Sequence, residues 1–265
     1  RDEFNARVKI AEGWLSDKDI KAGCYFLVGF GENHIDELVL RVAAGHLAAI
    51  PITINWQADT LASIKVKSEI ANARIILHHS SYIGFDLSEF RRCFPELELF
   101  SIPDFATLNL AEENTPRRIE QEQREDRDQI IIFTSGTTGR PKGVRLSSYA
   151  YRMNAEIFYS FLNLQVEQRI RVLLVNPLYH ANSTAMADFA MRNNSAEIIL
   201  VSKYSGKYWK ILTEVCSDFD GTVIAPVVSR HFEYLENLVN GNNIKMSEAL
   251  KSALERARFL VGSAP

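Results

Sequence analysis

The sequence of 265 residues has no apolar run near the ~20 residues that a helix needs to cross a bilayer. Its first apolar stretch is interrupted by Arg7, Lys9 and Glu12, a pattern that does not resemble a secretory signal peptide. We therefore expect neither a membrane span nor a leader, although an internal fragment would have lost any targeting segment.

Cysteine is also scarce. Cys24, Cys93 and Cys216 lie far apart and form no CxxC pair, so a disulfide framework is not expected. The plainer interpretation is three small, buried, hydrophobic side chains. An odd count without a framework favours a reducing compartment, and we expect a cytoplasmic protein.

The sequence also has no excess of basic over acidic residues. The formal net charge is -3 and the isoelectric point is near 6.1, so the bulk charge attracts neither nucleic acid nor an anionic membrane. With 46% hydrophobic and 24% charged residues, the composition is typical of a soluble globular protein. The length allows one large or two smaller domains.

Short apolar runs alternate with helix-like patterns along most of the chain. Strands are expected at 24–28, 49–53, 74–77, 97–100, 129–133, 144–147, 171–175, 197–201, 221–225 and 258–261. Helices are expected at 37–47, 60–71, 87–93 and 149–162, the last with Ser148 as its N-cap. A polar stretch at 111–128, interpreted as a linker or surface helix, separates two such blocks. Repeated strand–helix–strand units predict an α/β fold with parallel sheets covered by helices.

One loop carries the chemistry. Directly after the strand at 129–133, residues 135–143 read Ser-Gly-Thr-Thr-Gly-Arg-Pro-Lys-Gly. Glycines let the backbone approach a ligand closely, and consecutive N–H groups can form an anion-binding nest. Hydroxyls add donors, while Arg140 and Lys142 add positive charge. At the carboxyl end of a parallel strand, such a loop is suited to binding a polyphosphate.

Two common phosphate-binding motifs are excluded here. A Walker A loop needs Ser or Thr directly after its Lys, whereas Lys142 follows Pro141 and precedes Gly143. The spacing is not GxGxxG either. A P-loop NTPase is therefore disfavoured, and a plain hydrophilic hairpin turn would need fewer glycines and hydroxyls.

Residues 134–144 resemble the signature loop of the superfamily that contains acyl-CoA synthetases, peptide-synthetase adenylation domains and firefly luciferase. In that family the loop handles the β- and γ-phosphates of ATP, and the enzyme makes an acyl-adenylate before it transfers the acyl group to a thiol. The resemblance implies these phosphate-binding residues: Thr134, Ser135, Gly136, Thr137, Thr138, Gly139 and Lys142.

Weaker resemblances follow in the family's order. The segment at 40–55 is similar to an early structural motif. The segment at 176–180 is similar to one whose last residue lines the acyl pocket, here His180, and the segment at 222–226 resembles another wall of that pocket, with Ala225 and Pro226. The adenine-side segment would comprise Gly262, Ser263, Ala264 and Pro265.

The remaining histidines, including the adjacent His78 and His79, have no metal-like partners at useful spacing. We expect them to be structural or at the surface, and we expect no metal site within the chain.

The resemblance implies two packed, parallel-rich sheets flanked by helices. Residues 1–265 would form an incomplete N-terminal AMP-binding domain, with one subdomain at about 22–162 and another combining 1–21 with 166–265. The family's magnesium-binding glutamate, ribose-binding aspartate and catalytic lysine would lie beyond Pro265, and the C-terminal domain would be absent. ATP, Mg²⁺ and coenzyme A are therefore expected to serve the complete enzyme, and this chain alone is expected to have little adenylation activity.

The substrate class rests on one segment. Amino-acid adenylation domains place an aspartate where this chain has residues 178–184, Leu-Tyr-His-Ala-Asn-Ser-Thr, without an acidic side chain. An acyl-CoA synthetase of fatty acid metabolism is therefore favoured for a fatty or aryl acid. An amino-acid adenylation domain comes second, and a non-catalytic nucleotide-binding remnant is the alternative from another class.

Overall fold

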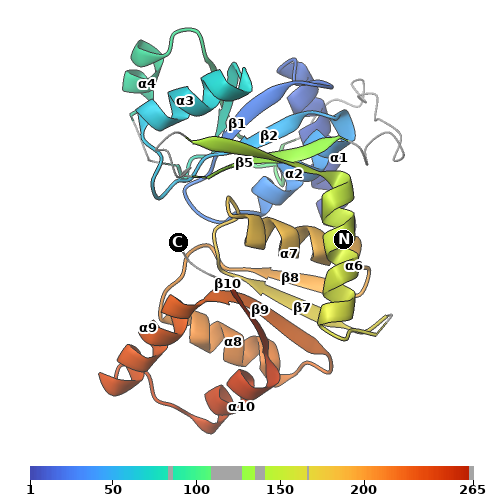
Figure 1. Ribbon diagram of the computed structural model, residues 1–265, viewed down its shortest axis with the longest axis vertical. Helices are drawn as coiled ribbons and strands as arrows, with labels where there is room; N and C mark the ends of the chain where they lie inside the picture. Colours follow the sequence, from blue (N-terminus) through green and yellow to red (C-terminus); the bar gives the residue numbers. More distant parts are fainter. Residues whose placement is uncertain (83–85, 109–126, 135–140, 166, 263–265) are drawn as a thin grey trace. The chain divides into compact units, whose positions relative to one another are not determined.

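The computed structural model describes residues 1–82, 86–108, 127–134, 141–165 and 167–262. The chain divides into two compact units, Arg1–Ala150 and Tyr151–Pro265, and the division falls within helix α6 (Ser148–Phe161). Each unit contains a sheet rich in parallel strands and flanked by helices, so the predicted α/β class is confirmed (Figure 1).

The first unit is built on a six-stranded sheet with the strand order β4-β3-β1-β2-β5-β6. Its elements are α1 (Asp2–Asp17), β1 (Tyr25–Gly29), α2 (Ile35–Leu47), β2 (Ile50–Thr53), α3 (Leu61–Ala71), β3 (Ile75–His78), α4 (Leu87–Cys93), β4 (Glu98–Ser101), β5 (Asp128–Thr134) and β6 (Lys142–Ser147). The pairings among β1 to β5 are parallel, whereas β6 returns antiparallel to β5.

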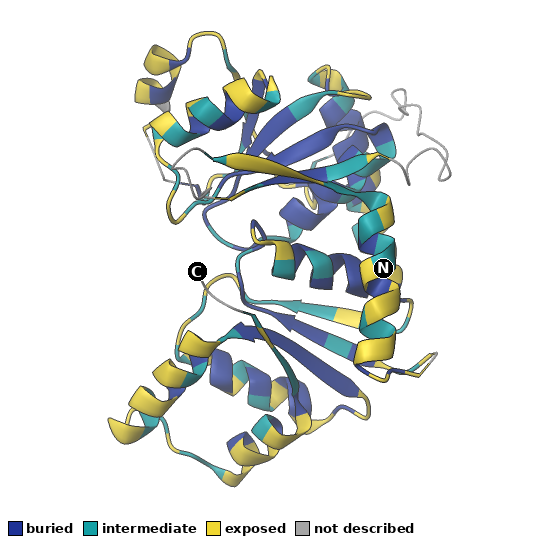
Figure 2. Cartoon of the chain, viewed as in Figure 1, coloured by how far each residue is buried: buried dark blue, intermediate teal, exposed yellow. Residues whose placement is uncertain are grey.

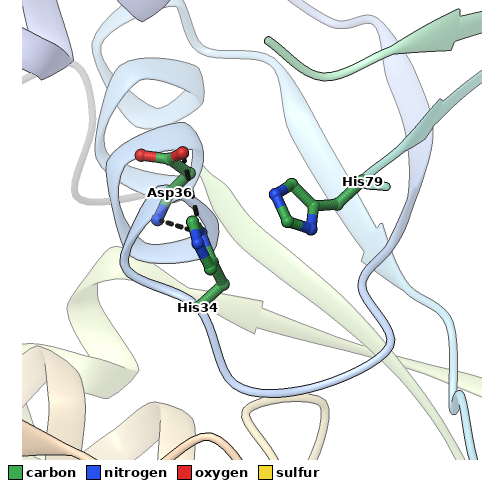
Figure 3. A group of neighbouring side chains, drawn as sticks. All are labelled: His34, Asp36 and His79. Atoms are coloured by element: carbon green, nitrogen blue, oxygen red, sulfur yellow. Dashed lines mark hydrogen bonds and ion pairs between the residues drawn. The ribbon is translucent and has the colours of Figure 1, made fainter. Parts of the chain in front are cut away.

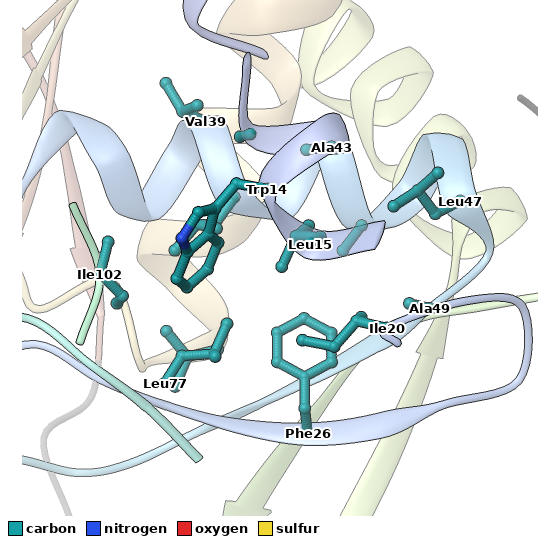
Figure 4. Close-up of a cluster of buried hydrophobic side chains, with 14 of the residues drawn as sticks. Trp14, Leu15, Ile20, Phe26, Val39, Ala43, Leu47, Ala49, Leu77 and Ile102 are labelled. Carbon is teal, nitrogen blue, oxygen red and sulfur yellow. The ribbon is translucent and has the colours of Figure 1, made fainter. Parts of the chain in front are cut away.

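Helices cover both faces of this sheet, which explains its uninterrupted apolar strands. In β1, the side chains of Phe26 and Val28 enter a core with α1 and α2, while Leu27 enters a second core with α3 and α4. Successive residues of a strand point to opposite faces, so both faces must be apolar here. Figure 4 shows Phe26 beneath Trp14 and Leu15 of α1.

The second unit contains a four-stranded sheet, all parallel, in the order β10-β9-β7-β8. Besides α6, its elements are β7 (Ile170–Leu174), α7 (Ala181–Arg192), β8 (Ala196–Leu200), α8 (Lys207–Ser217), β9 (Thr222–Val228), α9 (Ser229–Asn240), α10 (Glu248–Arg256) and β10 (Arg258–Gly262). One hydrophobic core of this unit joins Leu173 and Val223 of the sheet to Trp209 of α8, Leu235 of α9 and Leu250 of α10. Figure 2 shows β7 and β9 largely buried, with exposed residues along the outer sides of α9 and α10.

Ten strands were predicted, and each overlaps a strand in the part of the chain that the structure describes. The predicted N-cap differs by one residue. Ser147, and not Ser148, supplies the hydroxyl that accepts the Ala150 N–H at 3.1 Å. The polar stretch lies outside the described residues up to 126, and its last residue, Asp128, begins β5.

The expected subdomain division also differs from the structure. We expected residues 1–21 to join the second subdomain, but α1 packs along α2 in the first unit, where Val8, Ala11 and Leu15 are buried. The division after Ala150 also lies earlier than the expected boundary near 162. The cause is the apolar side of α1, which buries its area against α2 and the first sheet.

The cysteines follow the expectation only in part. All three are free thiols: Cys216 is buried, Cys24 is half-buried and Cys93 is exposed. Cys93 ends the short helix α4, so it contributes no core packing there. Across the described residues, none of the helices is both long and apolar enough to span a membrane.

Candidate functional site

The predicted phosphate loop closes the β5–β6 hairpin. Thr134 at the end of β5 pairs with Lys142 at the start of β6, and Phe133 pairs with Gly143. Both Thr134 and Lys142 are exposed. The predicted phosphate-binding residues Ser135, Gly136, Thr137, Thr138 and Gly139 lie outside the described residues.

Side-chain packing explains why glycine occupies position 143. A Cβ atom at Gly143 would lie 3.1 Å from Cγ2 of Ile131 and 3.1 Å from Cζ of Phe133. These distances are tighter than ordinary van der Waals contact, so a side chain would push against β5. At the far end of the hairpin, Arg145 forms an ion pair with Asp128 at 2.5 Å. The packing at Gly143 and the ion pair of Arg145 with Asp128 therefore hold β5 and β6 together near both ends of the hairpin.

The positive charges near the hairpin have different surroundings. Lys67 of α3 is buried against Asp59, with which it forms an ion pair, and its Nζ lies 5.4 Å from the centre of the Phe133 ring. Lys142, the first residue of β6, is exposed. An exposed ammonium beside a glycine-rich loop is suited to a phosphate ligand, whereas the charge of Lys67 is balanced inside the fold.

The second unit brings two of the predicted segments together at the carboxyl ends of its strands. His180 is the N-cap of α7, which follows β7, and Gly262 ends β10. A Cβ atom at Gly262 would lie 2.8 Å from Nδ2 of Asn182. The first turn of α7 therefore packs directly on the end of β10. The other adenine-side residues, Ser263, Ala264 and Pro265, lie outside the described residues.

Asn182 is a residue that sequence reasoning missed. It lies within the segment compared with the acyl pocket, but only folding brings it to Gly262. His180 itself is exposed, its ring centre lies 4.4 Å from that of Tyr179, and partial desolvation lowers the pKa of its imidazole. A neutral imidazole is therefore its prevailing form at neutral pH.

Ala225 and Pro226 lie within β9, an inner strand of the sheet, and not at the carboxyl end of that strand. Ala225 is 0% exposed and pairs with Phe259 of β10, while Pro226 is buried and pairs with Leu260. Both residues can support the wall of a pocket from its buried side. Val228, at the end of β9, and the side chains that directly follow it are more accessible to solvent than Ala225 and Pro226.

A hollow of about 410 Å³ opens beside this strand end. Its lining residues come from the segment between β8 and α8, from the end of β9 and from α9: Tyr204, Val228, Arg230, His231, Glu233, Tyr234 and Asn237. The His231 and Tyr204 rings stack with centres 3.9 Å apart. The Tyr204 hydroxyl donates to the His231 carbonyl at 3.0 Å and accepts from Trp209 Nε1–H at 3.0 Å.

Burial keeps this aromatic wall uncharged. It lowers the pKa of His231 to about 4 and raises the pKa of Tyr204 to about 12. We expected His231 to be structural or at the surface. It lines the hollow because the fold brings the end of β9 beside the segment that follows β8.

The first unit contains a side-chain group that the sequence analysis did not anticipate. We expected the remaining histidines to lack metal-like partners, but His34, Asp36 and His79 offer ligand atoms within 4.8 Å of one another (Figure 3). Burial raises the pKa of Asp36, with opposing contributions from His34 and Arg7, and desolvation lowers the pKa of His79. Two separate parts of the chain, the start of α2 and the segment after β3, therefore bring two imidazoles and a carboxylate together.

Comparisons with known proteins agree with the glycine-rich loop. The family model that matches residues 3–265 is described as AMP-binding enzyme. A very long-chain fatty acid transport protein from Cochliobolus heterostrophus is 26% identical over 216 residues, 78% of this chain and 32% of that protein. The mitochondrial medium-chain acyl-CoA ligase ACSF2 of Homo sapiens is 39% identical over 80 residues, 29% of this chain and 13% of that protein. The chain thus spans about a third or less of the length of these relatives.

The fold also matches a solved structure. The O-succinylbenzoate coenzyme A synthetase MenE of Bacillus subtilis, in complex with AMP, superposes with a TM-score of 0.74 at 17% identity. The match covers 99% of this chain and 61% of that one. The same enzyme in complex with ATP and magnesium ion gives a TM-score of 0.72 at 16% identity. At such identities the likeness concerns the fold alone.

Proposed function

Because the chain belongs to the AMP-binding enzyme family, which its residues 3–265 match, we propose that it forms part of an ATP-dependent, AMP-forming acid–thiol ligase. In this proposal the complete enzyme activates a carboxylic acid as an acyl-adenylate and transfers the acyl group to a thiol, which we take to be coenzyme A.

The observation that carries the proposal is the pairing of Thr134 with Lys142 at the base of the loop. This pairing sets both ends of the glycine-rich segment at the carboxyl end of a parallel strand, where ligands bind in open α/β sheets. The N–H groups and hydroxyls of residues 135–139 would bind the β- and γ-phosphates together with Lys142. A bound Mg²⁺ ion would neutralise part of the phosphate charge there.

The adenine would lie against the backbone of residues 262–265. The close approach of Gly262 to Asn182 supports this, because a side chain at 262 would occupy the space beside the first turn of α7. Asn182 has both a donor and an acceptor in its amide, and it would help to fix the position of that backbone segment.

The acyl group would bind near His180 and in the hollow beside β9, with Ala225 and Pro226 behind it. The neutral ring pair of Tyr204 and His231 favours an apolar or aryl chain over a charged one. This chemistry agrees with the absence of an acidic side chain at 178–184. The fatty acid transport protein and the medium-chain ligase among the relatives also support an aliphatic acid.

In the reaction we propose, a carboxylate oxygen attacks the α-phosphorus of ATP, and pyrophosphate leaves. The thiol then attacks the acyl carbon, and AMP leaves. The residues of this chain would bind the outgoing phosphates and orient the acyl group. We also propose a cytoplasmic location, for which the scarcity of cysteine is the support.

The test is a panel of carboxylates offered with ATP and Mg²⁺ to the complete protein, with AMP measured in the presence and absence of coenzyme A. We expect AMP to form only with an acid present, and acyl-CoA to appear when coenzyme A is added. Activity with amino acids alone would favour the adenylation-domain alternative. Release of ADP, or no acid-dependent AMP with any member of the panel, would contradict the proposal.

A further inference from the structure

We propose that His34, Asp36 and His79 bind a single divalent transition-metal ion, with zinc as the best match, at a site separate from the nucleotide loop. The ligand atoms of these three residues lie within 4.8 Å of one another. Two imidazoles and one carboxylate are a common protein ligand set for zinc and related ions. Magnesium and calcium prefer sites made of oxygen atoms alone.

Two adjacent strands bring the three residues together. β1 and β3 are parallel neighbours in which Gly29 pairs with His78. His79 therefore follows the carboxyl end of β3, while the chain after β1 leads to His34, the N-cap of α2. Asp36 lies in the first turn of that helix. The site thus rests on the ends of regular elements, which hold side chains more firmly than a free loop does.

Asp36 provides the second, independent observation. Asp36 is 0% exposed, and among the described residues neither carboxylate oxygen accepts a hydrogen bond of normal geometry, although the nearby Phe105 backbone partly opposes the rise that burial causes in the pKa of this carboxyl. The nearest cationic groups are His34 Nδ1 at 3.6 Å and Arg7 Nη1 at 3.9 Å. Ion pairs of this length compensate a buried carboxylate only in part, and a bound cation would compensate it further.

The His34 and His79 rings lie 4.4 Å apart between centres and are inclined by 32°, so one ring would turn on metal binding to direct its nitrogen to the same ion as the other. His34 Nδ1 lies 3.6 Å from Asp36 Oδ2, near the ~3.3 Å that separates two ligands on a tetrahedral zinc ion with bonds of ~2.0 Å. The Asp36 N–H now donates to His34 Nδ1 at 3.2 Å, and metal binding at Nδ1 would replace this bond. Figure 3 shows one ring nitrogen of His79 turned toward the other two residues.

Neighbouring residues support His79 and close one side of the group. Both contacts with Ser81 involve Nδ1 of His79: the Ser81 backbone N–H donates to it at 3.2 Å, and Ser81 Oγ lies 2.8 Å away. Nε2 is therefore the ring nitrogen left for the metal, and it would bind the ion after losing its proton. The Phe30 ring stacks on His79 and His34, with ring centres 4.9 and 5.9 Å away. Three protein ligands would leave the fourth position of a tetrahedral ion for water.

The test uses the chelator-stripped chain and titration with Zn²⁺ alone, measured by calorimetry and by the unfolding temperature. We expect one equivalent to bind and to raise the unfolding temperature, because an ion that binds only the folded state stabilises it. Mg²⁺ at the same concentrations should have no such effect. Co²⁺ should bind in the same place and give visible absorption typical of a site with fewer than six ligands.

Substitutions distinguish Zn²⁺ binding at this site from nonspecific binding of Zn²⁺ to the surface. His79→Ala and Asp36→Asn should each weaken Zn²⁺ binding by at least about 10-fold. His78→Ala removes a neighbouring imidazole that does not belong to the group, and it should leave the affinity unchanged. Asp36→Asn keeps the shape of the side chain, so the metal-free variant should fold, and its unfolding temperature should no longer respond to Zn²⁺.

The proposal would be overturned by the absence of one-to-one binding, or by Zn²⁺ binding that survives His79→Ala and Asp36→Asn. An equal loss of Zn²⁺ affinity in His78→Ala would also overturn the proposal, because it would indicate nonspecific binding of Zn²⁺ to the surface. Lys142→Ala should keep full Zn²⁺ affinity. This site can therefore be tested without reference to the proposed ligase activity.

Discussion

Thr134 and Lys142 are directly paired across the β5–β6 ladder, one on each side of the glycine-rich segment. The pairing places the backbone of Lys142 beside the end of β5, next to the segment expected to bind phosphate. A substitution in the hairpin can therefore change two measurable quantities, the stability of the β5–β6 pairing and the affinity for nucleotide.

Gly143 should be sensitive to the smallest possible side chain. A Cβ atom there would lie 3.1 Å from atoms of both Ile131 and Phe133, so Gly143→Ala should lower the free energy of unfolding by about 1–3 kcal/mol. Urea denaturation measures this. Gly45→Ala is the matched control, because its Cβ would meet nothing within 4 Å in helix α2. The control should raise stability by about 0.5–1 kcal/mol, and two changes of the same sign would refute the packing argument.

The contact between Gly262 and Asn182 predicts energetic coupling. In Gly262→Ala, the new methyl group would lie 2.8 Å from Asn182 Nδ2, so the Asn182 side chain must move. We expect a loss of about 1 kcal/mol that is partly relieved when Asn182→Ala is added, with a coupling of about 0.5 kcal/mol or more. A double-mutant cycle from denaturation curves measures it. Strictly additive effects would mean that the two residues do not touch.

His231 should make the stability of the protein depend on pH. Burial lowers its pKa from 6.5 to about 4, so the unfolded chain binds a proton in this range before the folded chain does. The stabilising contribution is fully present above pH 6.5 and is lost as the pH falls toward 4. The slope from this one group is at most about 1.4 kcal/mol per pH unit. Denaturation at a series of pH values should show a shallower decline in His231→Gln, and an unchanged decline would argue against the shift.

The sequence predicted the regular elements well because their signals are local. The apolar runs that became β1 and β3 are buried on both faces, and such strands are recognisable without knowledge of their neighbours. The packing partner of α1 could not be predicted from a local pattern. The apolar residues of α1 indicate that one side of the helix is buried, but they do not identify α2 as the helix that covers it.

The site was predicted only in part for a similar reason. The loop at 134–142 is contiguous, so its residue types alone indicate its chemistry. The group of His34, Asp36 and His79 is assembled from the ends of two strands that pair only in the folded sheet. The contact of Asn182 with Gly262 likewise depends on strand order, which no local pattern encodes.

The purified chain should show little or no carboxylate-dependent exchange between pyrophosphate and ATP. The residues assigned to the nucleotide, at 134–142 and 262–265, are expected at the outer phosphates and the adenine, so we expect them to stabilise little of the charge that develops on the α-phosphate. Radiolabelled pyrophosphate exchange with the acids that support AMP formation in the complete protein measures this. Robust exchange by the chain alone would show that residues 1–265 suffice for adenylation.

The most direct test of the central claim compares a non-hydrolysable ATP analogue with AMP by calorimetry, in the original chain and in a variant with Lys142→Ala and Thr137→Ala. If the hairpin loop binds the β- and γ-phosphates, the variant should lose about 10-fold or more in affinity for the triphosphate, or about 1.4 kcal/mol. Its affinity for AMP should change by less than about 2-fold, or roughly 0.4 kcal/mol. Equal losses for the two nucleotides would contradict the assignment of this loop to the outgoing phosphates of ATP.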